Sequence, residues 1–124
     1  MKRITISTEN VLLTAVLNET ETAEKMWGIL PMEGNGNSWG EEIYFSIPLH
    51  LMEEPSAHAD VEIGDLGYWP PGKAFCIFFG PTPASSGEKP RAASPVNVFG
   101  VIQGDATQLS KVKDGSLIRI FRAV

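Results

Sequence analysis

Short stretches of alternating apolar and polar residues recur along the chain, and this pattern limits it to folds built mainly from β-strands. Residues 2–8 alternate Ile4 and Ile6 with polar side chains, and residues 42–47 alternate in the same way. The pattern predicts about eight strands in total, and further ones lie at 11–17, 66–69, 73–79, 96–103 and 117–122. Many short strands joined by turns are typical of an antiparallel barrel or sandwich.

A single stretch has convincing helical spacing. Its apolar residues recur at intervals of three and four, at Ala23, Met26, Trp27 and Leu30. We therefore expect one main α-helix over about residues 20–30, capped by Thr20 or Asn18 and ended by Pro31. A short helical turn is also predicted at 106–111.

The remaining segments have the composition of turns and loops. Residues 34–37 are glycine and asparagine, which favour turns, and residues 48–60 lack a regular pattern. Pro70-Pro71-Gly72 predicts the turn of a hairpin. Residues 80–95 carry four prolines, and we expect them to form a long surface loop. No change in composition divides the chain, so residues 1–124 are predicted to form one domain.

Charge and composition exclude several classes of protein. The net charge of −5 and pI near 4.9 oppose a surface that binds nucleic acid or anionic lipid. The longest apolar stretch, residues 74–79, is too short to span a membrane. Cys76 is the only cysteine, which fits a reducing compartment, and we expect the protein to be cytoplasmic.

No set of side chains predicts a metal site, a cofactor or a catalytic nucleophile. His50, Glu53, Glu54, His58 and Asp60 lie close together in sequence, but their spacing matches no known ligand motif. A solvated loop is the simpler interpretation, so no metal and no cofactor is expected. Cys76 lies in an apolar strand without a cationic neighbour in sequence, which predicts an inert thiol.

The order of the predicted elements resembles that of the cyclophilins. More specifically, residues 64–83, GDLGYWPPGKAFCIFFGPTP, look like the signature of a family of small prokaryotic cyclophilin-like domains of unsettled function. The resemblance covers nearly the whole chain. It implies a closed eight-stranded antiparallel β-barrel, capped by the helix at about 20–30.

True cyclophilins are peptidyl-prolyl isomerases, and the resemblance implies that an arginine on the barrel wall would be needed for that activity. Such a guanidinium favours the twisted transition state of the X–Pro bond over the planar ground states. The four arginines here are Arg3, Arg91, Arg119 and Arg122, and none falls in the segment 39–47 where the comparison places the catalytic one. That segment carries Glu41 and Glu42 instead. We therefore name no catalytic residue.

The favoured interpretation is a binding protein with an apolar cleft for a small ligand or an extended peptide, gated by the loop 80–95. The candidate ligand-binding residues are Phe75, Trp39, Tyr44, Phe45, Phe99 and Arg91. Phe75 comes from the strand that resembles the cyclophilin pocket strand, but a shift of one residue in register would turn it into the core. Trp39, beside flexible glycines, fits either a binding element or a plug at the end of the barrel.

Two alternatives remain open from the sequence. In the first, the protein is a weak prolyl isomerase in which a backbone amide, or Arg91 from the loop, replaces the wall arginine. In the second, it is a subunit of a larger enzyme, and the barrel has a structural role.

Overall fold

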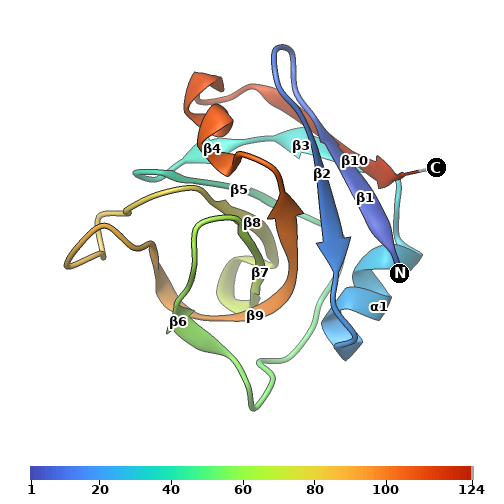
Figure 1. The fold of residues 1–124 in the computed structure, drawn as a ribbon. Helices are drawn as coiled ribbons and strands as arrows, with labels where there is room; N and C mark the ends of the chain where they lie inside the picture. The colour runs from blue at the N-terminus through green and yellow to red at the C-terminus, as the bar shows by residue number, and fades with distance from the viewer. Residues whose placement is uncertain (124) are drawn as a thin grey trace.

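The computed structural model describes residues 1–123, which form a strongly curved antiparallel sheet with one α-helix beside it (Figure 1). The strands are β1 (Arg3–Ser7), β2 (Leu12–Leu17), β3 (Met32–Asn35), β4 (Asn37–Ser38), β5 (Glu42–Ser46), β6 (His58–Asp60), β7 (Asp65–Trp69), β8 (Ala74–Phe78), β9 (Arg91–Gln103) and β10 (Leu117–Arg122). The helix α1 spans Glu21–Gly28, and two 3₁₀ helices, η1 and η2, span Pro70–Gly72 and Ala106–Lys111. No helix within residues 1–123 is long and apolar enough to cross a bilayer.

The sheet differs from the predicted eight-stranded closed barrel. Its strand order is β3-β10-β1-β2-β9-β7-β8-β5-β4, and β6 pairs with β9 beside this path, which makes ten strands. Within residues 1–123, hydrogen bonds between strands do not close the sheet. The two edge strands, β3 and β4, are nevertheless joined directly through Gly36, so the chain itself links the two edges. The mainly β, antiparallel class is confirmed.

The edge strands β3 and β4 occupy the tract that was predicted to be a turn, so that prediction was wrong. β3 pairs with β10, and β4 pairs with β5, through backbone groups that do not depend on side-chain patterning. Gly34 permits the close packing here, because a Cβ atom at this position would lie 2.6 Å from Cδ2 of Phe45. Glycine therefore marks a tight contact with the core at this position rather than a reversal of the chain.

The helical elements and their caps agree with the sequence patterns. The hydroxyl of Thr20 accepts a hydrogen bond from the backbone N–H of Ala23 at 3.2 Å, and so caps α1. α1 ends at Gly28, two residues earlier than expected. Trp27 is only partly buried, and the guanidinium of Arg122 lies 4.6 Å from the centre of one of its rings. The 3₁₀ helix η2 occupies the predicted turn at 106–111.

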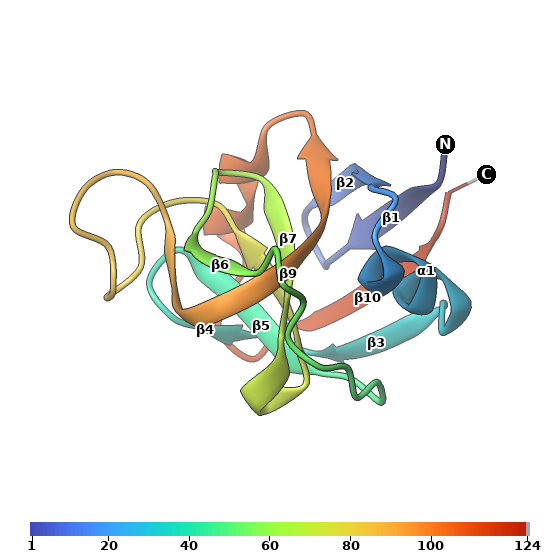
Figure 2. The same cartoon turned by 90° about the horizontal axis from the view of Figure 1, so that it is seen from below.

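Two predicted loops are shorter than expected. β6 lies within the stretch 48–60, and β9 begins at Arg91 rather than at Val96. Pro95 is accommodated inside β9 because it lies outside the paired positions of that strand. The connection between β8 and β9, drawn in yellow and orange, projects from the sheet in both views (Figures 1 and 2).

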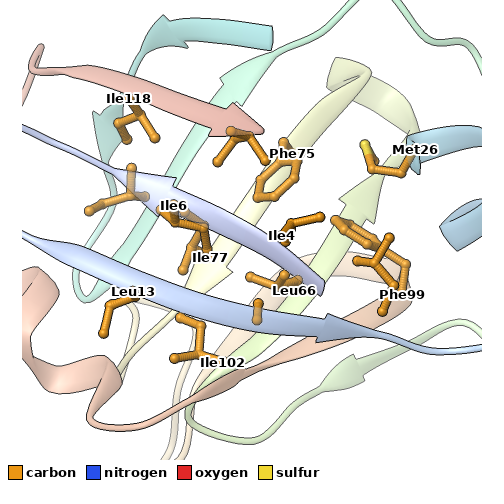
Figure 3. Close-up of a cluster of buried hydrophobic side chains, with 14 of the residues drawn as sticks. Ile4, Ile6, Leu13, Met26, Leu66, Phe75, Ile77, Phe99, Ile102 and Ile118 are labelled. Atoms are coloured by element: carbon orange, nitrogen blue, oxygen red, sulfur yellow. The ribbon is translucent and has the colours of Figure 1, made fainter. Parts of the chain in front are cut away.

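The main core lies on the inner face of the curved sheet (Figure 3). At its centre the ring of Phe75 stacks on that of Phe45, with centroids 5.4 Å apart, and meets the edge of Phe99 at 5.1 Å. Phe99 is an extra residue in β9 between the pairs Leu66–Gly100 and Gly67–Val98, and this bulge turns its ring inward. Phe121, on β10, lies outside this core and is exposed.

A second, smaller core covers the outer face of β8. Alternation along β8 places Phe75 and Ile77 in the main core, and sends Ala74, Cys76 and Phe78 into the second. The first half of β9 folds over these side chains, so that all five residues of β8 are buried. Burial on both faces explains why this strand is a continuous apolar run.

The long connection between β5 and β6 is held in place by buried polar side chains. The hydroxyl of Tyr68 donates to the carbonyl of Leu49 at 2.6 Å, and the backbone N–H of Glu54 donates to Oδ1 of Asn97 at 2.9 Å. Nδ2 of Asn97 donates to the hydroxyl of Thr22 and to the carbonyl of Met52. Asn97, only 1 % exposed, therefore joins the connection, α1 and β9.

Replacing Asn97 with alanine is expected to lower the free energy of unfolding by about 2 kcal/mol, because partly buried backbone groups of Met52 and Glu54 lose the partner that holds them. Urea unfolding measures this difference. Asn35→Ala is the matched control: the Asn35 amide makes one exposed hydrogen bond, to Gly115, and its loss should cost no more than about 0.5 kcal/mol. Equal losses in the two variants would contradict the role given to Asn97.

Candidate functional site

An apolar pocket lies at one edge of the second core, between the β4–β5 turn, β5, the end of β7 and the start of β9. It has a volume of about 190 Å³ and is lined by Trp39, Glu42, Tyr44, Trp69, Ala92, Ala93 and Val96. Three of these side chains are aromatic, and one is a carboxylate. An apolar hollow with few polar groups is the usual form of a small-molecule site.

A tight turn brings two of the lining residues together. The backbone N–H of Trp39 donates to the carbonyl of Glu42 at 2.9 Å, and that of Glu42 donates back to Trp39 at 3.2 Å. Gly40, at the first central position, has φ of +60°, the left-handed conformation that a type II′ hairpin turn requires there. The turn thus fixes the indole of Trp39 beside the carboxylate of Glu42.

Trp69 forms the wall on the side of β7 and is held by the segment that covers it. Its Nε1–H donates to the hydroxyl of Ser94 at 2.7 Å, which ties the indole to the first half of β9. Its ring lies over Gly72 in η1, where a Cβ atom would come within 2.8 Å of the indole. Trp69 therefore packs on the turn that follows it and still lines the pocket.

Glu42 is the unusual residue of the pocket, because it is a carboxylate that is only 6 % exposed. Its side chain takes part in none of the ion pairs found within residues 1–123, which are Lys89–Glu62, Arg91–Asp60 and Arg119–Glu33. Within residues 1–123, every side-chain oxygen that is fully buried has a hydrogen-bond partner. Glu42 is thus a largely buried carboxylate among the lining residues of the pocket that has no cationic partner.

Burial raises the pKa of Glu42 from 4.5 to about 7, and a hydrogen bond with the thiol of Cys76 offsets a part of this rise. The thiol comes from β8, where Cys76 pairs with Tyr44, two residues along β5 from Glu42. Burial and the nearby carboxyl raise the pKa of Cys76 well above its usual value. The thiol is thus held in its neutral form, which does not suit it to nucleophilic chemistry.

The structure separates the six predicted ligand-binding residues. Trp39 and Tyr44 line the pocket. Phe45, Phe75 and Phe99 are at most 2 % exposed and form the centre of the main core. The guanidinium of Arg91 forms an ion pair with Asp60 on β6, at 2.7 Å, and lies beside the pocket rather than among its lining residues.

Glu42, Trp69 and the three lining residues from β9 were not among the residues predicted to bind a ligand. The signal for Glu42 was present, because strand alternation places it on the same face as Tyr44 and opposite Phe45. Ala92 and Ala93 gave no such signal, since they were assigned to a surface loop, and Val96 was predicted only as the first residue of a strand. The neighbouring loop is in fact anchored by Thr82, whose hydroxyl donates to the carbonyl of Arg91.

The histidine and acidic side chains of residues 50–60 do not converge. His50, Glu53, His58 and Asp60 are exposed, and the carboxylate of Glu54 accepts a hydrogen bond from Thr22 instead. Within the part of the chain that the structure describes, no group of three or more His, Cys, Asp or Glu side chains is arranged to hold a metal ion.

The curved sheet, the helix beside it and the match to a family together identify the class of protein. The sequence profile of the family described as Cyclophilin-like matches residues 2–121, and the chain belongs to this family. Among solved structures, it is similar to the hypothetical protein AF2241 from Archaeoglobus fulgidus, determined in solution. The two share 39% identity over 98% of this chain and 95% of the other, with a TM-score of 0.83. A comparison with curated proteins found no match.

Proposed function

We propose that this protein binds a small organic molecule in the pocket lined by Trp39, Glu42, Tyr44 and Trp69. The observation that carries the proposal is the combination of three aromatic walls with a carboxylate that has neither an ion-pair partner nor free access to bulk solvent.

The volume favours a small ligand over an extended peptide. Pockets for drug-sized ligands have volumes of about 300–1,000 Å³, whereas this one has about 190 Å³. A head group or one short side chain fits that space. An extended peptide would also need a groove that continues past the pocket, and the loop after β8 is folded back onto β9 through Thr82.

The pocket supports binding better than it supports prolyl isomerisation. None of its lining residues is an arginine, and the described arginine nearest to it in sequence, Arg91, is engaged by Asp60. The group that faces a ligand is a carboxylate, which repels rather than stabilises the developing charge that a guanidinium would stabilise. We expect background rates in a protease-coupled assay with proline peptides.

A fragment screen by NMR on isotope-labelled protein tests the proposed function. We expect the amide signals of Trp39, Tyr44 and Trp69, and the indole N–H signals of both tryptophans, to shift with binding fragments. Trp39→Ala should weaken that binding at least about tenfold, since it removes one aromatic wall of a small site. Trp27→Ala on α1 is the matched control and should leave the binding unchanged. Shifts that map consistently to another surface would refute the assigned site.

A further inference from the structure

The polar groups of the pocket identify the kind of ligand that it fits, provided that the proposed function holds. Glu42 is the single carboxylate among the lining residues, and the other polar side-chain groups are the hydroxyl of Tyr44 and the indole N–H groups of Trp39 and Trp69. The N–H of Trp69 is already bonded to Ser94. The rest of the lining consists of two indole rings and the apolar side chains of β9. The net charge of −5 also favours the approach of a cation over that of an anion.

We propose that the ligand carries a methylated ammonium group, which is held against the aromatic side chains of Trp39, Tyr44 and Trp69 with its charge balanced by Glu42. Aromatic faces attract a cation through the negative potential of the ring, and they do so most strongly where water is excluded. A buried carboxylate without an ion-pair partner supplies the counter-charge that a desolvated cation needs.

The largely apolar lining favours a methylated ammonium over a primary one. A primary ammonium brings three N–H donors, which must all find acceptors when the group leaves water. The carboxylate of Glu42 and the hydroxyl of Tyr44 can accept such donors, but the indole rings and the β9 side chains that form the rest of the lining offer no acceptor. A trimethylated or dimethylated nitrogen has no donor or one, and its methyl groups can contact the indole rings.

Binding of such a cation should depend on pH, because Glu42 must be ionised to balance the charge. Cys76, on β8, is the titratable group in contact with this carboxyl. The other residues around it are uncharged: Trp39 in the turn, Tyr44 on β5, Trp69 on β7, and Ala92, Ala93 and Val96 on β9. Cys76 stays neutral near pH 7. Arg91 and Asp60 are paired with each other beside the pocket, so Glu42 is the residue whose titration should control the affinity.

Choline is the probe, and its neutral carbon analogue dimethylbutanol, in which a quaternary carbon replaces the nitrogen, is the control. We expect choline to bind at least about tenfold more tightly than the analogue at pH 8, as a cation held against aromatic rings beside a carboxylate implies. With a pKa near 7 for Glu42, the affinity for choline should rise roughly tenfold between pH 6 and pH 8. The affinity for the analogue should not change. Ethanolamine, which carries a primary ammonium, should bind more weakly than choline.

Glu42→Gln keeps the shape of the side chain and removes its charge. This variant should lose about tenfold in affinity for choline at pH 8, together with the pH dependence, and should keep its affinity for the neutral analogue. Glu41→Gln is the matched control, because the adjacent carboxylate lies over Gly80 and is not among the lining residues. It should behave as the wild type does.

The possible outcomes distinguish this inference from the proposed function. If the neutral analogue binds as tightly as choline, or if other fragments occupy the pocket and choline does not, the ligand class is wrong and the pocket remains a binding site. If neither choline nor any fragment shifts the signals of Trp39 and Trp69, both proposals fail. Choline binding that Glu42→Gln leaves unchanged also overturns the inference.

Discussion

Glu42→Gln should make the protein more stable at alkaline pH, by about 2–3 kcal/mol more at pH 8 than at pH 5 relative to the wild type. Burial raises the pKa of Glu42 from 4.5 to about 7, so the folded protein keeps this proton over a range in which the unfolded chain has lost it. The contribution of the protonated carboxyl is complete below pH 4.5 and is lost as the pH rises through 7. Glutamine does not titrate and therefore lacks this loss.

Urea unfolding at a series of pH values measures the effect as the difference between the two curves. The difference removes the titrations that both proteins share, and Glu41→Gln shows whether any neighbouring carboxyl gives the same result. A difference that stays constant from pH 5 to pH 8 would show that Glu42 titrates normally. It would also remove the basis for pH-dependent binding of a cation.

The same substitution is thus expected to raise stability and to lower binding. A carboxylate held in an apolar pocket is unfavourable for folding unless a ligand supplies its partner. Such opposition between stability and binding is common at functional sites, where strained or desolvated groups are kept for what they bind. Choline at a concentration well above its Kd should accordingly raise the Tm of the wild type at pH 8 more than that of Glu42→Gln.

Phe75→Ala is expected to lower the free energy of unfolding by about 3–5 kcal/mol, the largest loss among these variants. The side chain is fully buried, and its ring contacts those of Phe45 and Phe99 at the centre of the main core. Truncation leaves a cavity between strands whose hydrogen bonds prevent them from moving together. Thermal and urea unfolding both measure the loss.

The effect on binding separates the main core from the pocket. Because Phe75 lies on the opposite face of β8 from Cys76, Phe75→Ala should leave the affinity for a pocket ligand within about threefold of the wild type under conditions where the variant is folded. Phe121→Ala, at an exposed position, is the control for loss of a phenyl ring and should cost less than about 1 kcal/mol. A strong loss of binding in folded Phe75→Ala would place the ligand in the main core.

Alternation along single strands could be predicted from the sequence with good accuracy. It identified β1 and β5, and the other predicted strands, among them β2 and β10, completed the correct class of fold. It also contained the reason why Tyr44 and Phe45 cannot share a site, since neighbouring residues on a strand face opposite sides of a sheet. The candidate list joined them because aromatic content, rather than facing, was used to select residues.

The edge strands and the first half of β9 could not be predicted in this way. β3 is rich in glycine and polar residues, and residues 91–95 contain a proline, so neither has the pattern of a strand. Each becomes a strand because a neighbour distant in sequence, β10 for the one and β6 for the other, supplies backbone hydrogen bonds. Local propensity is a weak guide at such positions, where pairing and burial decide.

The chain by itself determined a mainly β fold with one helix, and it placed Glu42 and Tyr44 on the same face of one strand. Only the tertiary structure decided that this face is covered, because the cover is β9, which begins about fifty residues later. Covering that face turns an ordinary surface glutamate into a desolvated carboxylate between aromatic rings. Burial is a property of the assembled sheet and not of any segment, which is why the pocket and the raised pKa of Glu42 emerged only with the fold.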